Sequence, residues 1–110
     1  MRGTAAFVVS SNAVEGRADE LRTWYHEVHL ADARLIPGVT AATLYEWQPV
    51  EGRPASGHTF MAVYEVEGDA AGVWAEFDRR IEAGTIVMTS ALDPASLSFS
   101  VWKSSDDERG

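Results

Sequence analysis

Hydrophobic residues follow a period of two in some segments of this chain and a helical period in others. Residues 4–10 form a short apolar, β-branched run closed by a polar pair, which predicts a strand. Residues 39–48 are rich in β-formers, and residues 58–66 and 96–102 alternate apolar with polar side chains, so each is expected to be a strand. One face of the third strand is expected to carry Phe60, Ala62, Tyr64 and Val66. The segment 49–57, with two glycines and two prolines, is expected to be a hairpin loop.

Two other segments carry the period of an amphipathic helix. In residues 16–30 the positions i, i+3, i+4 and i+7 are Leu21, Trp24, Tyr25 and Val28. In residues 70–83 one stripe carries Ala70, Val73, Trp74, Phe77 and Ile81. Pro37 with Gly38 is expected to end the first helical region, and Gly84 the second. Residues 85–94 show no clear period.

The resulting order is β-α-β-β-α-β, which predicts a single α+β domain of the ferredoxin-like kind. It would span residues 1–110, with a core at about 4–102 and a polar tail over 103–110. A four-stranded antiparallel sheet would carry both helices on one face. Whichever strand parity faces the helices, the other face keeps several of Val8, Tyr45, Trp47, Met61, Val63 and Trp102. An exposed apolar patch of this kind is typical of an interface or ligand surface, so we expect a homodimer with sheet facing sheet.

Composition excludes several classes of function. The chain has 110 residues and a net charge of −8, which disfavours binding to nucleic acid or to an anionic membrane surface. It has no cysteine, which excludes disulfides, thiolate metal sites and a cysteine nucleophile. No apolar run approaches the roughly 18–20 residues that cross a bilayer. Because no such run is present, we expect a cytoplasmic protein. Motifs of nucleotide loops, nucleophile elbows and zinc sites are also missing, so we expect no metal or organic cofactor.

The densest group of ionisable and aromatic residues lies between Leu21 and Gly38. On a helical wheel, Asp32 lies near the centre of the apolar face and His29 lies at its edge. Because Asp32 follows His29 by three residues, its carboxylate could orient the imidazole and raise its basicity, as a general base requires. The alternative is that His29 is a histidine at the edge of the core and that Asp32 caps a short turn over residues 33–36.

Aromatic residues from the strands and helices supply the other candidates. Tyr64, and also Tyr45, could polarise a carbonyl or hold an enolate beside a histidine. Substrate-binding candidates are Trp24, Tyr25, Arg34, Tyr45, Trp47, Trp74 and Trp102. The aromatic residues could equally build the core, and Arg34 could bind an anionic group or pair with Asp32. His26 is expected to face solvent, and His58 to lie in a turn or at a pocket mouth.

The segment Trp24-Tyr25-x-x-x-His29, followed by Leu30-Ala31-Asp32 and Ile36-Pro37-Gly38-Val39, resembles EthD-like proteins of the dimeric α+β barrel superfamily. Residues 62–66 and, before the last strand, 88–93 add to the resemblance. It implies two sheets that dimerise into a barrel with the helices outside. Members of the superfamily include cofactor-free cyclases, isomerases, lyases, decarboxylases and oxygenases, and others bind haem.

The hypothesis is therefore a homodimeric, cofactor-independent enzyme that performs acid–base chemistry on a small apolar carbonyl or phenolic substrate. His29 would be the general base or acid, Asp32 would orient it, and Tyr64 would polarise the substrate. A non-catalytic small-molecule-binding or accessory protein of the same fold is the first alternative. A haem-binding or haem-linked protein is the second.

Overall fold

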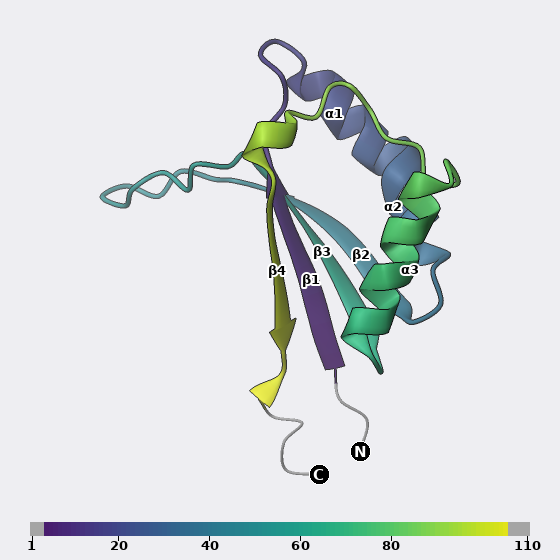
Figure 1. Ribbon diagram of the computed structural model, residues 1–110. Helices are drawn as coiled ribbons and strands as arrows, with labels where there is room; N and C mark the ends of the chain where they lie inside the picture. The colour runs from purple at the N-terminus through teal and green to yellow at the C-terminus, as the bar shows by residue number, and fades with distance from the viewer. Residues whose placement is uncertain (1–3, 106–110) are drawn as a thin grey trace.

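The computed structural model describes residues 4–105 and shows four antiparallel strands in one open sheet, with helices on one of its faces (Figure 1). The strands are β1 (Thr4–Ser11), β2 (Val39–Glu46), β3 (Phe60–Glu67) and β4 (Ser98–Lys103). The helical segments are α1 (Ala18–Trp24), the π-helical η1 (Tyr25–His29), α2 (Leu30–Arg34), α3 (Ala70–Glu82) and the 3-10 turn η2 (Pro94–Ser96). The strand order is β2-β3-β1-β4, and the architecture is compatible with a ferredoxin-like α+β fold. No helix within the described residues is long and apolar enough to span a membrane.

The predicted strands and helices are all present, with shifted ends. The hairpin loop between β2 and β3 runs from residue 47 to 59, longer than predicted at both ends. The last strand starts at Ser98, because Asp93 accepts a hydrogen bond from the amide of Ala95 and caps η2 just before it. The corresponding carboxylate of Asp69 accepts from the amide of Ala71 and starts α3.

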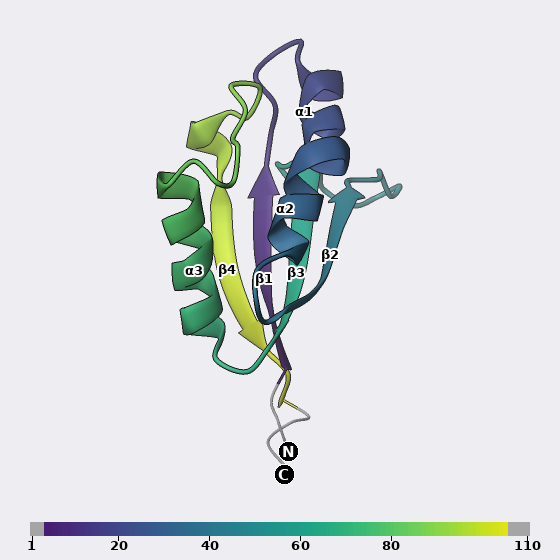
Figure 2. The same cartoon turned by 90° about the vertical axis from the view of Figure 1, so that its right-hand side faces the viewer.

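The β1–β3 pairing decides which side chains meet the helices. Phe7 lies opposite Tyr64 and Ser11 opposite Phe60, so these side chains share one face of the sheet. All four are buried, as are Ala62 and Val66. This confirms that the four predicted residues of the third strand share one face, and it shows that this face meets the helices. Figure 2 shows α3 beside the continuous helix formed by α1, η1 and α2, both in front of this face.

One helical turn, at η1, departs from α geometry. The amide of Leu30 donates to the carbonyl of Tyr25, five residues earlier, so the turn holds one more residue than an α turn. Residues after it are therefore displaced by one position, about 100°, around the helix axis. His29 and Ala33 are buried, whereas Asp32 is only half-buried. The prediction of one regular helix with Asp32 at the centre of its apolar face was wrong.

The turn at Gly38, which follows α2, lies close to α3. Gly38 has φ +99°, and a Cβ there would lie 2.7 Å from Cγ2 of Val73 in α3. Only a glycine fits this position without moving its neighbours. The reversal that was expected after Pro37 therefore also fixes how α3 approaches the start of β2.

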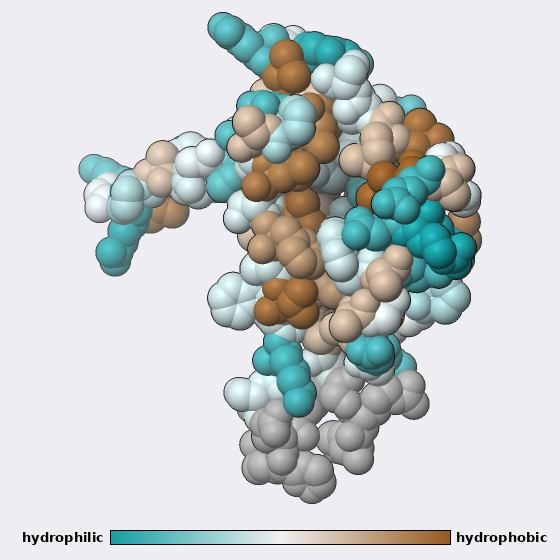
Figure 3. Space-filling model, in the orientation of Figure 1, coloured by the Kyte–Doolittle hydropathy of each residue, from teal (hydrophilic) through white to brown (hydrophobic). Residues whose placement is uncertain are grey.

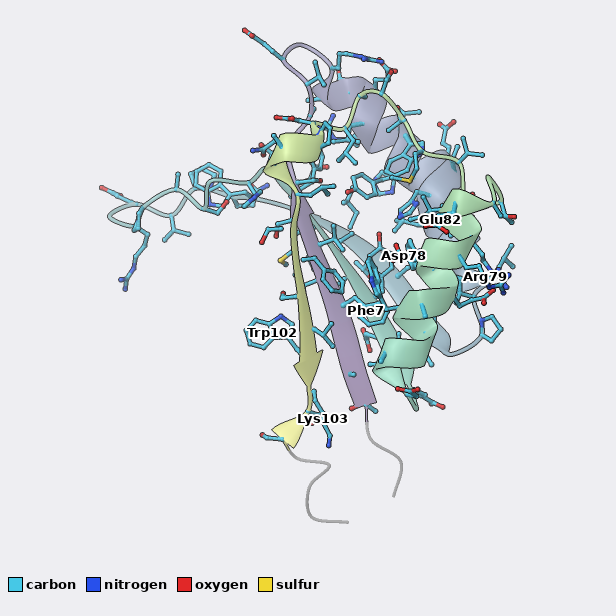
Figure 4. All side chains as sticks on the ribbon, viewed as in Figure 1. Phe7, Asp78, Arg79, Glu82, Trp102 and Lys103 are labelled. Atoms are coloured by element: carbon cyan, nitrogen blue, oxygen red, sulfur yellow. The ribbon has the colours of Figure 1, made fainter. Side chains whose placement is uncertain are left out.

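The face of the sheet away from the helices, called the outer face below, keeps large apolar side chains in contact with solvent. Tyr45, Met61 and Trp102 are 52%, 38% and 63% exposed. Figure 4 shows Trp102 pointing away from the helices, whereas Phe7 points toward them. The 47–59 loop projects as an arm on the side of the outer face (Figure 1).

Candidate functional site

An apolar cavity of about 110 Å³ lies between the helices and the sheet. Its buried wall includes Trp24, Tyr25, His29, Tyr64 and Phe77. Its more exposed wall includes Trp74 from α3 and Met88 and Leu97 from the segments after it. A band of apolar side chains, which includes Leu97, Phe99 and Val101, follows β4 at the surface (Figure 3). The cavity therefore passes from a closed polar end to an open apolar side.

The closed end holds a histidine–tyrosine pair. Nε2 of His29, from η1, lies 2.8 Å from the hydroxyl of Tyr64, from β3. His29 is 4% exposed and Tyr64 is 2% exposed. Nδ1 of His29 is buried and has no hydrogen-bond partner within the described part of the chain. The pair joins the helical layer to the sheet and leaves one polar atom unsatisfied.

Aromatic rings surround the imidazole of His29. Trp24 stacks on it at 4.4 Å between centroids, while Tyr64 and Phe77 approach at 5.9 and 5.7 Å. The indole of Trp24 is itself fixed, because Nε1 donates to the carbonyl of Val87 at 2.9 Å. An imidazole enclosed in this way has a defined orientation and little solvent to stabilise a positive charge.

Burial keeps the titratable groups of the site neutral. It lowers the pKa of His29 to about 4, because desolvation penalises the imidazolium. Burial also raises the pKa of Tyr64 far above its usual value, and the nearby Tyr25 adds to that effect. The pKa of Tyr25 is raised by burial and lowered in part by its hydrogen bond with Ser11. At neutral pH the site therefore presents a neutral imidazole and two neutral phenols.

A second buried polar pair adjoins the first. The hydroxyl of Tyr25 lies 3.0 Å from Oγ of Ser11, and both side chains are buried. Ser11 ends β1, and Tyr25 begins η1, so this hydrogen bond also connects the sheet to the helical layer. Tyr25 contacts the edge of the His29 ring at 5.7 Å. The buried hydroxyl and imidazole groups in and next to the cavity thus come from two strands and one turn of helix.

The structure brings some of the predicted site residues together and separates others. His29, Tyr64, Trp24, Tyr25 and Trp74 all line the cavity. Tyr45, Trp47 and Trp102 do not line it; they are exposed, with Tyr45 and Trp102 on the outer face. Of the predicted aromatic residues, those on the helices and on the inner face of β3 line the cavity, and those on the outer face or in the 47–59 loop do not.

The predicted pair of His29 with Asp32 does not form. Within residues 4–105 there is no hydrogen bond or ion pair between them, because the extra residue in η1 turns Asp32 away from the cavity. Asp32 is a residue of α2 and not the cap of a turn over 33–36. Arg34 is exposed, and its guanidinium donates to the carbonyl of Ala42 at 2.6 Å instead of pairing with Asp32. The carboxylate expected to orient His29 is replaced by the phenol of Tyr64.

The remaining histidines lie outside the cavity. His26 is exposed, as predicted, and His58 donates through Nε2 to the carbonyl of Ser96 at 2.9 Å. The hydrogen bond between His58 and Ser96 connects the base of the 47–59 arm to η2. Among residues 4–105, no three His, Asp or Glu side chains gather as metal ligands would.

Sequence reasoning missed several residues of the site. Phe77 and Ile81 belong to the apolar stripe predicted for residues 70–83, and that stripe does not distinguish a cavity wall from the core. Met88 and Leu92 fall in the stretch without a period, which gave no signal for their position. The partnership of Ser11 with Tyr25 joins residues 14 apart, and nothing in the pattern indicates it.

Comparison of the chain with protein families, with curated proteins and with solved structures found no match.

Proposed function

We propose that the protein binds a small, largely apolar carbonyl or phenolic compound in the cavity and performs acid–base chemistry on it without an organic cofactor. His29 would exchange or share a proton with the ligand, and Tyr64 would hold the imidazole in place. The observation that carries this proposal is the buried His29–Tyr64 hydrogen bond at the closed end of an apolar cavity. Buried titratable groups in a concave apolar site are a common mark of ligand or active sites.

The chemistry follows from the protonation state. With its pKa lowered to about 4, His29 is a neutral imidazole at neutral pH, so it can share its N–H proton with a ligand without carrying a positive charge. The few polar groups around it leave little to stabilise an imidazolium, so His29 would act on the ligand as a neutral partner in a hydrogen bond. Hydrogen bonds in such a dry site act more strongly on a developing charge than they do in water.

Exchange of α-hydrogens tests this proposal without knowledge of the natural substrate. Cyclohexanone is incubated with the protein in D2O, and proton NMR follows the loss of its α-hydrogen signal. The wild type should accelerate exchange above the buffer rate, and His29→Ala should lose that acceleration, because general acid–base catalysis contributes about 10²–10⁴-fold. His26→Ala, which removes an exposed histidine three residues away, is the matched control and should retain it. Equal rates in wild type and His29→Ala would contradict the proposal.

A non-catalytic binding protein is the second candidate. The apolar lining of the cavity and its single unpaired polar atom favour it, because these features bind a ligand without requiring turnover. A ligand that co-purifies with the protein, and that is chemically unaltered when it is released after long incubation, would support this candidate. The haem alternative gains no support, since the cavity of about 110 Å³ is small and Nε2 of His29 is already bonded to Tyr64.

We also propose that the chain is a dimeric α+β barrel protein of the EthD-like type, in which two outer faces pack together. The order of elements and the exposed Tyr45, Met61 and Trp102 on the outer face support this proposal. Light scattering at micromolar concentration should give the mass of a dimer, and Trp102→Glu should shift it to the monomer. Leu35→Glu, at a residue that is 73% exposed and belongs to the helical layer, should leave the dimer intact. A monomeric wild type would refute the assembly.

A further inference from the structure

The polar valences of the closed end can be counted atom by atom. A neutral imidazole has one N–H donor and one lone-pair acceptor, and a phenol has one O–H donor and an acceptor oxygen. The 2.8 Å contact between Nε2 of His29 and the hydroxyl of Tyr64 can therefore run in either direction. In residues 4–105 it is the only side-chain hydrogen bond of either residue, and Nδ1 of His29 is left buried.

The two directions differ in the strength of the hydrogen bond that they form. If Nε2–H donated to Tyr64, the lone pair of Nδ1 and the Tyr64 O–H would both lack a partner. If Tyr64 donates to Nε2, the phenol proton and the Nε2 lone pair satisfy each other, and the Nδ1–H of His29 and the weakly accepting phenol oxygen are left. A phenol O–H is a stronger donor than an imidazole N–H, and an imidazole nitrogen is a stronger acceptor than a phenol oxygen, so the second arrangement pairs the stronger groups and is favoured.

Among the described residues, no side chain around His29 offers an acceptor for that remaining N–H. Trp24 covers one face of the ring and uses its own N–H on the carbonyl of Val87. Phe77 approaches at 5.7 Å and has no polar atom. The hydroxyl of Tyr25 is engaged with Ser11. The Nδ1–H is therefore a donor held ready beside an apolar cavity that His29 itself lines.

We infer that His29 recognises its ligand as a neutral hydrogen-bond donor through Nδ1–H, and that the ligand is an apolar ketone, aldehyde or lactone whose carbonyl oxygen accepts this bond. The inference rests on the proposed binding of a small molecule in the cavity and narrows its class from carbonyl or phenolic to carbonyl. Tyr64 is then a positioning residue that selects the Nδ1–H tautomer. A neutral imidazole can polarise a carbonyl in this way, because its donor is fixed and needs no reorganisation.

The cavity also limits the size of the ligand. Its volume of about 110 Å³ is below the roughly 150 Å³ of an apolar cavity that accommodates benzene. A small ring with its carbonyl at Nδ1 would therefore fill the cavity and leave its far edge in the open side. That edge, and the substituents of a larger ligand, would lie toward Met88 and Leu97, which are 42% and 46% exposed.

The tautomer is tested first, in the ligand-free wild type labelled with ¹⁵N-histidine. NMR couplings of the ring nitrogens distinguish a protonated Nδ1 from a protonated Nε2. We expect His29 to be protonated at Nδ1 at pH 7, and Tyr64→Phe should shift the population toward a mixture of tautomers. Protonation of His29 at Nε2 in the wild type would overturn the inference while leaving the proposed binding site standing.

The ligand class is tested with two probes of the same shape, cyclohexanone and methylenecyclohexane, of which only the first has an acceptor oxygen. Affinities are measured by quenching of tryptophan fluorescence in the wild type and in His29→Phe, which keeps a ring of similar size. The preference for cyclohexanone should fall by about three- to tenfold in His29→Phe, the factor that corresponds to one net hydrogen bond. An unchanged preference would overturn the donor role, whereas failure of both probes to bind the wild type would overturn the proposed function as well.

Discussion

Deletion of Glu27 should leave the protein folded with His29 still buried, because η1 contains one residue more than an α turn. Removing an exposed residue from this turn converts it to α geometry. His29 and Ala33 then follow Leu21 and Tyr25 at regular helical spacing and keep their inward positions. We expect the free energy of unfolding to change by no more than about 1 kcal/mol, as for a surface change that removes no core contact.

Deletion of Ala31 is the matched control. Ala31 is also exposed, but it lies after η1, so its loss leaves the π turn in place and rotates the following residues by about 100°. Ala33 and Ile36, which are 0% and 1% exposed, would leave the core. Removing a large apolar side chain from a core costs about 2–5 kcal/mol, and we expect a loss in this range.

Urea denaturation measures both deletions, and an NMR titration of His29 in the Glu27 deletion checks the site. We predict a large difference in the urea midpoint between the two deletions, and a His29 pKa that stays well below 6.5 in the Glu27 deletion. Equal destabilisation by both deletions, or a His29 in the Glu27 deletion that titrates as if exposed, would show that η1 does not hold the extra residue that turns His29 inward.

Three further predictions concern stability. Because the pKa of His29 falls from 6.5 to about 4 on folding, roughly 3 kcal/mol of the free energy of unfolding is present above pH 6.5 and is lost as the pH falls toward 4. His29→Phe should remove this part of the pH dependence, as measured by denaturation curves at a series of pH values. Tyr64→Phe should cost about 1–3 kcal/mol in urea denaturation by leaving Nε2 of His29 unpaired, whereas Tyr45→Phe on the exposed outer face should cost under about 0.5 kcal/mol, and equal costs would contradict the buried pair. Gly38→Ala should lower the melting temperature more than Gly16→Ala, since both have positive φ but only the first would place a methyl 2.7 Å from a side chain of α3; the reverse order would contradict the close approach.

The sequence predicted the strands and which side chains of the third strand share a face, because a period of two is a local property. Phe60, Ala62, Tyr64 and Val66 alternate in the sequence and are buried together in the structure. The helical stripe likewise placed Trp74 and Phe77 against the sheet. In both cases the side-chain direction follows from spacing alone, without knowledge of the partner.

The site could be predicted only in part, because the inward position of His29 depends on the extra residue in the π-helical turn η1. A regular helix places His29 at the edge of the apolar face and Asp32 near its centre, and no residue type marks the extra residue of η1. Once the phase shifts, His29 turns inward and meets Tyr64, a residue 35 positions away. Contacts at that separation depend on how the layers pack, which the pattern of one segment does not encode.

The central claim is that a carbonyl ligand binds beside His29, and a titration of the ¹⁵N-histidine-labelled protein with cyclohexanone tests it most directly. Saturable shifts of the His29 ring nitrogens, largest at Nδ1, with little change at the exposed His26 or at His58, are the predicted result. His29 signals that stay constant up to saturating cyclohexanone, or shifts confined to His26 and His58, would contradict it.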